Sequence, residues 1–250
     1  MNKIIVGLTS WPGRINFIGQ TLDSIVKQEI LPDEFYLILS EKEFPNKEAD
    51  LPKYILDFKD QYSFFKIEWT SDNLKNFKKT LPLIKKYIND TSVILYIIDD
   101  DVYYEKNYIK DTLKEFLLAN TEKNTVITWN FPWNRDSWVR HPEKQRLIGH
   151  FSIYRPCFFK PIVYSIKESD LYEYEYLSED NWISYNLRQN NINFKMLPYE
   201  DLVPLYKYTK TEKISPLNKI HHNIRLAKIQ AFIKLCYNKY SNVYNETSKI

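Results

Sequence analysis

Glycine, cysteine and long apolar runs are all scarce in this 250-residue sequence, and each scarcity excludes a class of protein. Of only four glycines, Gly7 and Gly13 alone do not make the glycine-rich phosphate loop that a nucleotidyltransferase would carry after its first strand. The two cysteines, Cys157 and Cys236, fall in no metal-binding or redox spacing, which favours a reducing compartment. No run approaches the roughly 18 apolar residues of a membrane span, and the first residues lack the apolar core of a signal peptide.

Charge of either sign is also not in large excess. The net charge of +3 is too small to indicate nucleic-acid binding. The hydrophobic fraction of 44% and the charged fraction of 27% are ordinary for a folded protein, and the length fits one α/β domain with a tail. We therefore expect a cytoplasmic protein without a nucleic-acid partner.

Two apolar periods alternate along the first half of the chain. Period-two and continuous apolar runs predict strands, and three-four spacing predicts helices. The expected strands are 3–8, 35–39, 66–69, 93–98 and 126–129, and the expected helices between them are 15–28, 52–60, 77–88 and 105–119. Such alternation is typical of parallel strands joined by crossover helices, and ligands of these sheets bind outside the carboxyl ends of the strands. Further on, we expect a site-lining loop over 129–145, a helix over 179–190 and a strand over 194–197.

The most informative stretch is the apolar run Val93–Ile98, which leads straight into Asp99, Asp100 and Asp101. Like charges side by side raise the cost of ionising each other, and a fold tolerates them most easily where a cation binds. Mg²⁺ and Mn²⁺ are held by such oxygens, usually one or two carboxylates together with substrate phosphates. The stretch predicts metal-assisted phosphate chemistry at the end of a central strand; the alternative is a solvated acidic turn.

Three segments occur in the order found in a known family. Residues 8–15 read LTSWPGRI, residues 97–104 read IIDDDVYY, and residues 178–182 read SEDNW. Together they resemble a GT-A fold bacterial glycosyltransferase, family-2-like and of the surface-polysaccharide type. The corresponding segments of that family are a TSxPxRI opening, a DDD box and a later acidic pair. The resemblance covers roughly residues 3–200 and implies an α/β fold: a single GT-A-like (Rossmann-like) domain with a mostly parallel central sheet flanked by helices, plus a C-terminal helical segment.

The resemblance also implies how the chain is divided. Residues 1–205 would be the GT-A-like catalytic domain, with a nucleotide-sugar-binding half over 1–104 and an acceptor half over 105–205. Residues 206–250 would be a basic helical extension. Within it, 216–240 carries an apolar stripe flanked by basic residues, which would lie on an anionic membrane or dock on the domain or a second protomer.

The acidic triplet would hold the donor and its metal ion. By resemblance, Asp99 would face the ribose and the metal shell, Asp101 would hold the ion directly, and Asp100 would lie towards the sugar. The ion, Mn²⁺ or Mg²⁺, would neutralise the diphosphate that leaves a UDP- or GDP-sugar. His221 is a further candidate ligand, because neutral imidazole binds Mn²⁺; the alternative is a surface histidine pair with His222.

The loop after the first strand supplies further donor-binding candidates. Trp11 would stack on the base, Thr9 and Ser10 would hydrogen-bond to it, and Arg14 offers a planar set of donors for phosphate or base oxygens. By resemblance, Lys79 would approach the diphosphate. The alternatives are that Thr9 and Ser10 only turn the chain, that Arg14 lies on the surface, and that Lys79 belongs to a solvated helix face.

The acidic pair Glu179–Asp180 is the candidate for the catalytic base. An inverting transfer needs a carboxylate that takes the proton of the acceptor hydroxyl, and we favour Asp180 over Glu179 for this role. The alternative is that the pair only stabilises the positive N-terminal end of the helix.

These residues together predict an inverting, metal-dependent glycosyltransferase of bacterial surface polysaccharide synthesis. The acceptor would be a glycan or a lipid-linked glycan, and peripheral contact of 216–240 would place the protein at the inner face of the cytoplasmic membrane. One alternative is a haloacid-dehalogenase-type phosphatase or phosphotransferase, but Tyr103 stands where that class usually has a threonine. Another is a nucleotide-sugar-binding protein without catalysis.

Overall fold

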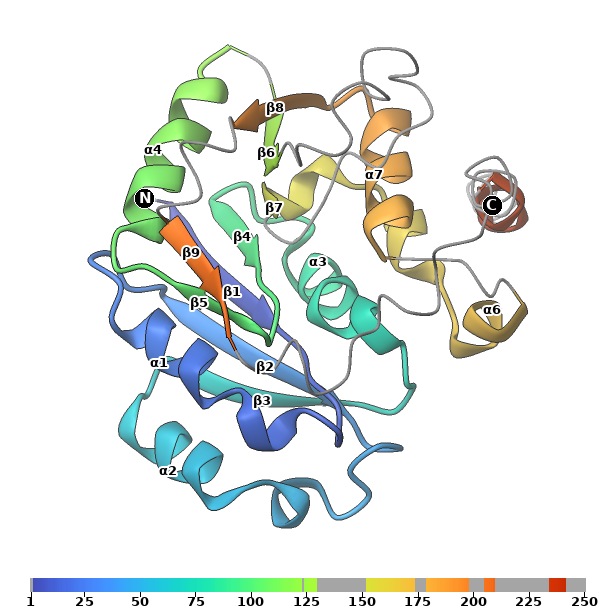
Figure 1. Ribbon diagram of the computed structural model, residues 1–250. Helices are drawn as coiled ribbons and strands as arrows, with labels where there is room; N and C mark the ends of the chain where they lie inside the picture. Colours follow the sequence, from blue (N-terminus) through green and yellow to red (C-terminus); the bar gives the residue numbers. More distant parts are fainter. Residues whose placement is uncertain are drawn as a thin grey trace.

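A seven-stranded sheet forms the centre of the molecule (Figure 1). The computed structural model describes residues 2–122, 124–129, 152–173, 179–197, 205–209 and 234–241. All strands of the sheet run in one direction except β7, which is antiparallel to its neighbours β4 and β6. The order across the sheet is β3 (Phe65–Thr70), β2 (Glu34–Ser40), β1 (Lys3–Leu8), β4 (Val93–Ile97), β7 (Ser152–Tyr154), β6 (Thr125–Trp129) and β8 (Asn193–Leu197).

Helices cover both faces of this sheet, so its central strands have no solvent-facing side. All five residues of β4 are buried, as expected for a parallel strand that is apolar on both faces. On one face lie α1 (Gly19–Val26), α2 (Lys53–Gln61) and α4 (Tyr108–Ala119); on the other lie α3 (Leu81–Tyr87) and α7 (Glu179–Gln189), with α6 (Glu168–Glu173) on the same side of the picture (Figure 1).

Neighbouring residues of β2 show this two-sided burial. The Phe35 ring packs edge-on against Phe65, which also contacts Phe58 of α2. The next residue, Tyr36, faces the opposite side, where its hydroxyl lies 3.0 Å from that of Tyr87 at the end of α3. Alternating side chains of one strand therefore pack against helices on opposite faces of the sheet.

A small second sheet follows the acidic triplet directly. The chain turns after β4 into β5 (Val102–Tyr104), which pairs antiparallel with β9 (Tyr206–Tyr208). Short 3₁₀ turns complete the described structure: η1 (Ile15–Phe17), η2 (Lys47–Asp50), η3 (Lys75–Lys79), η6 (Pro156–Phe158) and η7 (Pro161–Ser165).

The predicted elements are confirmed for the most part, and the differences have local causes. The expected helix 15–28 is interrupted at Ile18 and the helix 77–88 at Thr80, so each consists of a 3₁₀ turn followed by an α-helix. The helix expected from 105 begins at 108, because residues 102–104 are taken up by β5. Residues 206–208, which begin the predicted helical extension, form β9 instead.

The rest of the extension is described only in part. Residues 234–241 are helical, and the remainder of the predicted helix 216–240 lies outside the described residues, as does the expected loop after 129. Among the described residues, no helix is both long and apolar enough to cross a bilayer.

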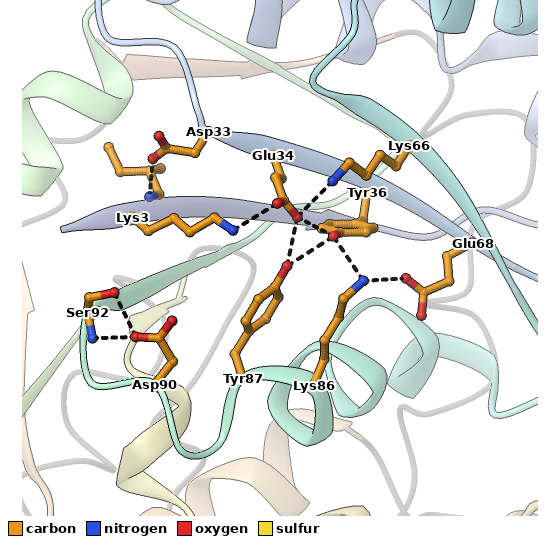
Figure 2. A network of polar contacts seen from close by, with 11 residues as sticks. Lys3, Asp33, Glu34, Tyr36, Lys66, Glu68, Lys86, Tyr87, Asp90 and Ser92 are labelled. Atoms are coloured by element: carbon orange, nitrogen blue, oxygen red, sulfur yellow. Dashed lines mark hydrogen bonds and ion pairs between the residues drawn. The ribbon is translucent and has the colours of Figure 1, made fainter. Parts of the chain in front are cut away.

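A polar network occupies the amino ends of β1 and β2 (Figure 2). At its centre, the Glu34 carboxylate accepts hydrogen bonds from Lys3 at 2.8 Å, from Tyr87 at 2.7 Å and from Tyr36, and Lys66 lies 3.2 Å away. Burial acts to raise the pKa of Glu34, but these donors outweigh it and lower the pKa to about 2. The Glu34 carboxylate at this end of the sheet is therefore stabilised by hydrogen-bond donors and lysines of the protein itself.

Candidate active site

The candidate site lies at the opposite end of the sheet, where β1 and β4 end side by side. Gly7 of β1 is in register with Ile97 of β4, and the backbone N–H of Ile98 donates to the Gly7 carbonyl at 3.0 Å. The loop that begins at Thr9 and the triplet that begins at Asp99 are therefore neighbours. This is the edge at which sheets of this kind bind ligands.

Asp100 joins these two loops. Its carboxylate accepts hydrogen bonds from the Ser10 hydroxyl at 2.6 Å and from the Arg14 guanidinium at 2.8 Å. The same Arg14 nitrogen lies 3.2 Å from Asp101. Burial raises the pKa of Asp100, although Arg14 and Ser10 act to lower it. Because its two oxygens are engaged by Ser10 and Arg14, Asp100 ties the β1 loop to the triplet.

Lys79 joins the triplet to the second acidic segment. Its ammonium lies 2.5 Å from Asp99 and 3.4 Å from Glu179, and its side chain is only 7% exposed. The neighbouring Lys78 is also buried, where it pairs with Glu43. The interpretation of this segment as a solvated helix face is therefore wrong, because both lysines point inward to carboxylates.

Glu179 and Asp180 begin α7 and differ in environment. Glu179 is buried, where one carboxylate oxygen accepts a hydrogen bond from Thr80 and the other faces Lys79. Burial raises the pKa of Glu179 to about 7; Lys79 opposes this and the adjacent Asp180 adds to it. Asp180 is half-buried, so it is the member of the pair with the greater exposure to solvent.

The backbone of the triplet is held by residues that the sequence analysis did not single out. The Thr21 hydroxyl of α1 lies 3.0 Å from the Asp100 carbonyl and 2.8 Å from that of Val102. The Asp99 N–H donates to the buried Tyr104 hydroxyl at 3.1 Å. For Thr21, the sequence signal was a polar residue inside an apolar helix stripe. No sequence signal pointed to the contact of Tyr104, because it depends on the turn into β5.

The remaining residues of the β1 loop have separate positions. The Thr9 hydroxyl donates to the Ile38 carbonyl of β2 at 2.6 Å, so it fixes the loop against the next strand. Trp11 is 36% exposed, and its ring lies directly over Gly13, where a methyl group would come within 2.4 Å of it. Only glycine at position 13 leaves room for this position of the ring.

Acidic and basic side chains are grouped at this edge of the sheet. Seven described residues make up the group, which we refer to as the acidic site: Arg14, Lys79, Asp99, Asp100, Asp101, Glu179 and Asp180. Among the described residues, no group of three or more His, Cys, Asp or Glu side chains could hold a metal ion, so no protein cage for one is present. Mg²⁺ does not need such a cage, since one or two carboxylates and substrate phosphates suffice. The residues present fit an ion that binds together with a phosphate-bearing ligand.

The structure thus brings together most of the predicted site residues. Ser10 belongs with the acidic site through Asp100, whereas Thr9 faces β2 and Trp11 lies at the rim. His221 lies outside the described residues, so its predicted role as a metal ligand stays a prediction.

Comparison with solved structures supports the fold. S. aureus TarS 1–349 in complex with UDP-GlcNAc aligns with a TM-score of 0.54 at 13% identity, over 94% of this chain and 65% of that one. S. aureus TarS aligns with a TM-score of 0.50 at 12% identity, over 96% of this chain. The chain spans 43% of the length of that protein. No family model and no curated protein matches the sequence.

The fold class predicted from the sequence is confirmed. The chain has an α/β fold of the GT-A-like kind, with a mostly parallel seven-stranded sheet flanked by helices, and it shares this fold with TarS. At 12–13% identity the likeness concerns the fold alone.

Proposed function

We propose that this protein is a metal-dependent glycosyltransferase that moves a sugar from a nucleotide-sugar to a glycan or lipid-linked acceptor with inversion. The observation that carries the proposal is the acidic site itself: the acidic triplet that follows β4 lies beside the β1 loop at the carboxyl ends of these strands, and Lys79 joins it to the acidic pair that begins α7, of which Asp180 is half-buried. The binding of UDP-GlcNAc by TarS, which has the same fold, supports a nucleotide-sugar as donor. Surface polysaccharide synthesis is the proposed setting.

The donor would bind across the triplet and the β1 loop. Asp99 and Asp101 are the residues that would hold Mn²⁺ or Mg²⁺, and the ion, when bound, supplies positive charge for the diphosphate. Asp100 and Arg14 would not hold the ion; they fix the loop that carries Trp11. Trp11 would then stack on the base of the nucleotide.

Asp180 would act as the base. Its carboxylate takes the proton of the acceptor hydroxyl while that oxygen forms a bond to the anomeric carbon. The bond from the anomeric carbon to the diphosphate breaks on the opposite face, and the diphosphate leaves with the electron pair. The configuration at the anomeric carbon is therefore inverted. Glu179 is buried against Thr80 and Lys79 and does not take this proton.

The proposal is tested first by ligand-induced thermal stabilisation. A panel of UDP-GlcNAc, UDP-glucose, UDP-galactose and GDP-mannose is added to the full chain with and without Mn²⁺. A ligand that binds only the folded state raises the melting temperature. We expect one or more donors to do so only with Mn²⁺ present, and to be converted slowly to free nucleoside diphosphate.

Two outcomes would count against the proposal. Phosphate release from sugar phosphates, with no response to any nucleotide, would favour the phosphatase alternative. Stabilisation without any release of nucleoside diphosphate, in water or with glycan acceptors, would indicate a binding protein that has no catalytic activity.

A further inference from the structure

Lys79 lies at the point where the two halves of the acidic site meet. Its ammonium contacts Asp99, at the end of β4, and Glu179, at the start of α7. The residue that follows it, Thr80, donates to the other oxygen of Glu179. The two-residue segment Lys79–Thr80 therefore engages both carboxylate oxygens of Glu179, and all three side chains are buried.

The backbone of Lys79 is fixed as tightly as its side chain. A methyl group on Gly7 would lie 2.4 Å from the Lys79 carbonyl oxygen and 2.6 Å from the Leu83 side chain. The segment before α3 thus rests directly on β1, which glycine alone permits. The backbone of Lys79, from which its side chain extends to the two carboxylates, therefore cannot shift without moving the central sheet.

We propose that Lys79 and Glu179 form a positioning link, which holds Asp180 at a fixed place relative to Asp99. The inference rests on the proposed function, in which Asp99 belongs to the donor side and Asp180 is the base. Glu179 itself touches no substrate in this scheme. It acts because Asp180 is the next residue of the same helix turn, so that any shift of Glu179 moves Asp180 as well.

A buried ion pair of this kind contributes placement more than stability. Removal of two charges from water offsets most of the attraction between them, so such a pair is weak support for stability on its own. The geometry of such a pair is nevertheless specific, because each buried charge lacks water and must be stabilised by contact with its partner. A misplacement of about 1 Å in a reacting group costs up to about a hundredfold in rate, so a link that sets the position of Asp180 has a large effect on turnover.

The link is tested by a double-mutant cycle on the full chain. The variants are Glu179→Gln, Lys79→Met and the two combined, assayed with Mn²⁺ and the member of the donor panel that the wild type converts. We expect Glu179→Gln to lower kcat about tenfold with the KM for the donor changed less than twofold, because Asp99 keeps Lys79. We expect Lys79→Met to lower kcat about a hundredfold and to raise the donor KM.

The double variant decides the question. Residues that act in one link are not additive, so we expect the double variant to have the kcat of Lys79→Met alone. A combined loss near a thousandfold, the product of the two single losses, would overturn the link. So would a Glu179→Gln variant whose loss lies in KM and not in kcat. Where Lys79→Met does not fold, Thr80→Val takes its place, since it removes the other contact of Glu179 without a change of charge.

Glu34→Gln is the matched control. It neutralises a partly buried glutamate in the network at the far end of the sheet (Figure 2), so it tests whether a loss of stability alone lowers kcat. We expect a lower melting temperature and an unchanged kcat. A wild type that converts no donor overturns the proposed function and with it the link; an active wild type with additive variants overturns the link alone.

Discussion

Glu34 and Glu179 are both held by polar partners at the ends of the same sheet, yet their surroundings shift their pKa values in opposite directions. Around Glu34, lysines and tyrosine hydroxyls supply donors, and its pKa falls to about 2. Around Glu179, burial and the adjacent Asp180 outweigh Lys79, and its pKa rises to about 7. One glutamate is charged at any ordinary pH, and the other is close to balance between its two forms at neutral pH.

The two ends of the sheet differ in how their carboxylates are matched by basic side chains. At the amino end the basic side chains match the carboxylate, so the cluster is complete within the protein (Figure 2). At the carboxyl end, five of the seven described residues of the acidic site are acidic, and burial raises the pKa of two of them, Asp100 and Glu179. Carboxylates with raised pKa values, such as Asp100 and Glu179, are typical of functional sites.

Among substitutions at the carboxyl end of the sheet, Asp180→Asn is expected to have the largest effect on activity. The variant keeps the size of the side chain but cannot take a proton, so kcat should fall about a thousandfold with the donor affinity unchanged. The measurement is release of nucleoside diphosphate together with thermal stabilisation by the donor. Full activity in this variant would transfer the role of base to another group.

Asp101→Asn should have the next largest effect. It removes a charge that would hold Mn²⁺, so the affinity for UDP in the presence of Mn²⁺ should fall about a hundredfold. Calorimetric titration with UDP, with and without Mn²⁺, measures it. Equal affinity for wild type and variant would mean that the ion binds elsewhere, and Glu34→Gln serves as the control that leaves this affinity unchanged.

The pH dependence of stability should show the raised pKa of Glu179. Because its pKa rises from 4.5 to about 7 on folding, the folded state binds the proton more tightly between these values. Its contribution to stability is full below pH 4.5 and is lost as the pH rises through 7. The unfolding free energy of the wild type should therefore fall relative to Glu179→Gln, by at most about 3 kcal/mol, between about pH 5 and pH 8. Urea unfolding at the two pH values measures this difference, and a constant difference would contradict the prediction.

Glu34 should show the reverse sign. Its pKa falls from 4.5 to about 2 on folding, so its contribution to stability is present above pH 4.5 and is lost as the pH falls through 2. Glu34→Gln should lower the unfolding free energy at neutral pH by about 2 kcal/mol, allowing for partial screening by solvent. The gap between wild type and variant should close on acidification towards about pH 2. A gap that stays open would show that the substitution destabilises the network through its shape and not through the lost charge.

The smallest effect is expected at the rim of the site. Gly13→Ala places a methyl group where the Trp11 ring lies, so the ring must move. If Trp11 stacks on the base, donor affinity should fall about threefold, a part of the roughly 1–3 kcal/mol that such stacking contributes. Gly19→Ala is the control, because a methyl group there meets Tyr54 only at an ordinary 3.5 Å. No change in the affinity for the donor would mean that Trp11 does not touch it.

The sequence predicts much of this arrangement because its signals are local. The apolar run of β4, the charge triplet after it and the acidic start of α7 each lie within a few consecutive residues, and the order of parallel strands brings their ends together. The burial of Lys79 is not a local property, and the repeat of a lysine pair at Lys85–Lys86 suggests a solvated face. In the structure, Lys79 is buried beside Asp99 and Glu179, and its carbonyl lies close to Gly7 of β1.

The second sheet shows the same limit more clearly. Residues 102–104 are too few for a strand pattern, and their partner strand, 206–208, lies far along the chain. Likewise, β7 has only three residues, and no periodicity encodes its antiparallel pairing with β4 and β6. Contacts that are distant in the chain and short in extent cannot be predicted from patterns of a single segment.

The pairing of β5 with β9 has a consequence for how the protein is made. The Thr209 N–H donates to the Asp101 carbonyl at 2.7 Å, although the two residues lie far apart in the chain. When β1, β4 and the whole triplet have been synthesised, the ribosome has yet to synthesise β9, which pairs with the strand that follows the triplet. The parallel strands β1 to β4 can therefore pair before β9 is synthesised, whereas the triplet acquires its contact with Thr209 only late in translation.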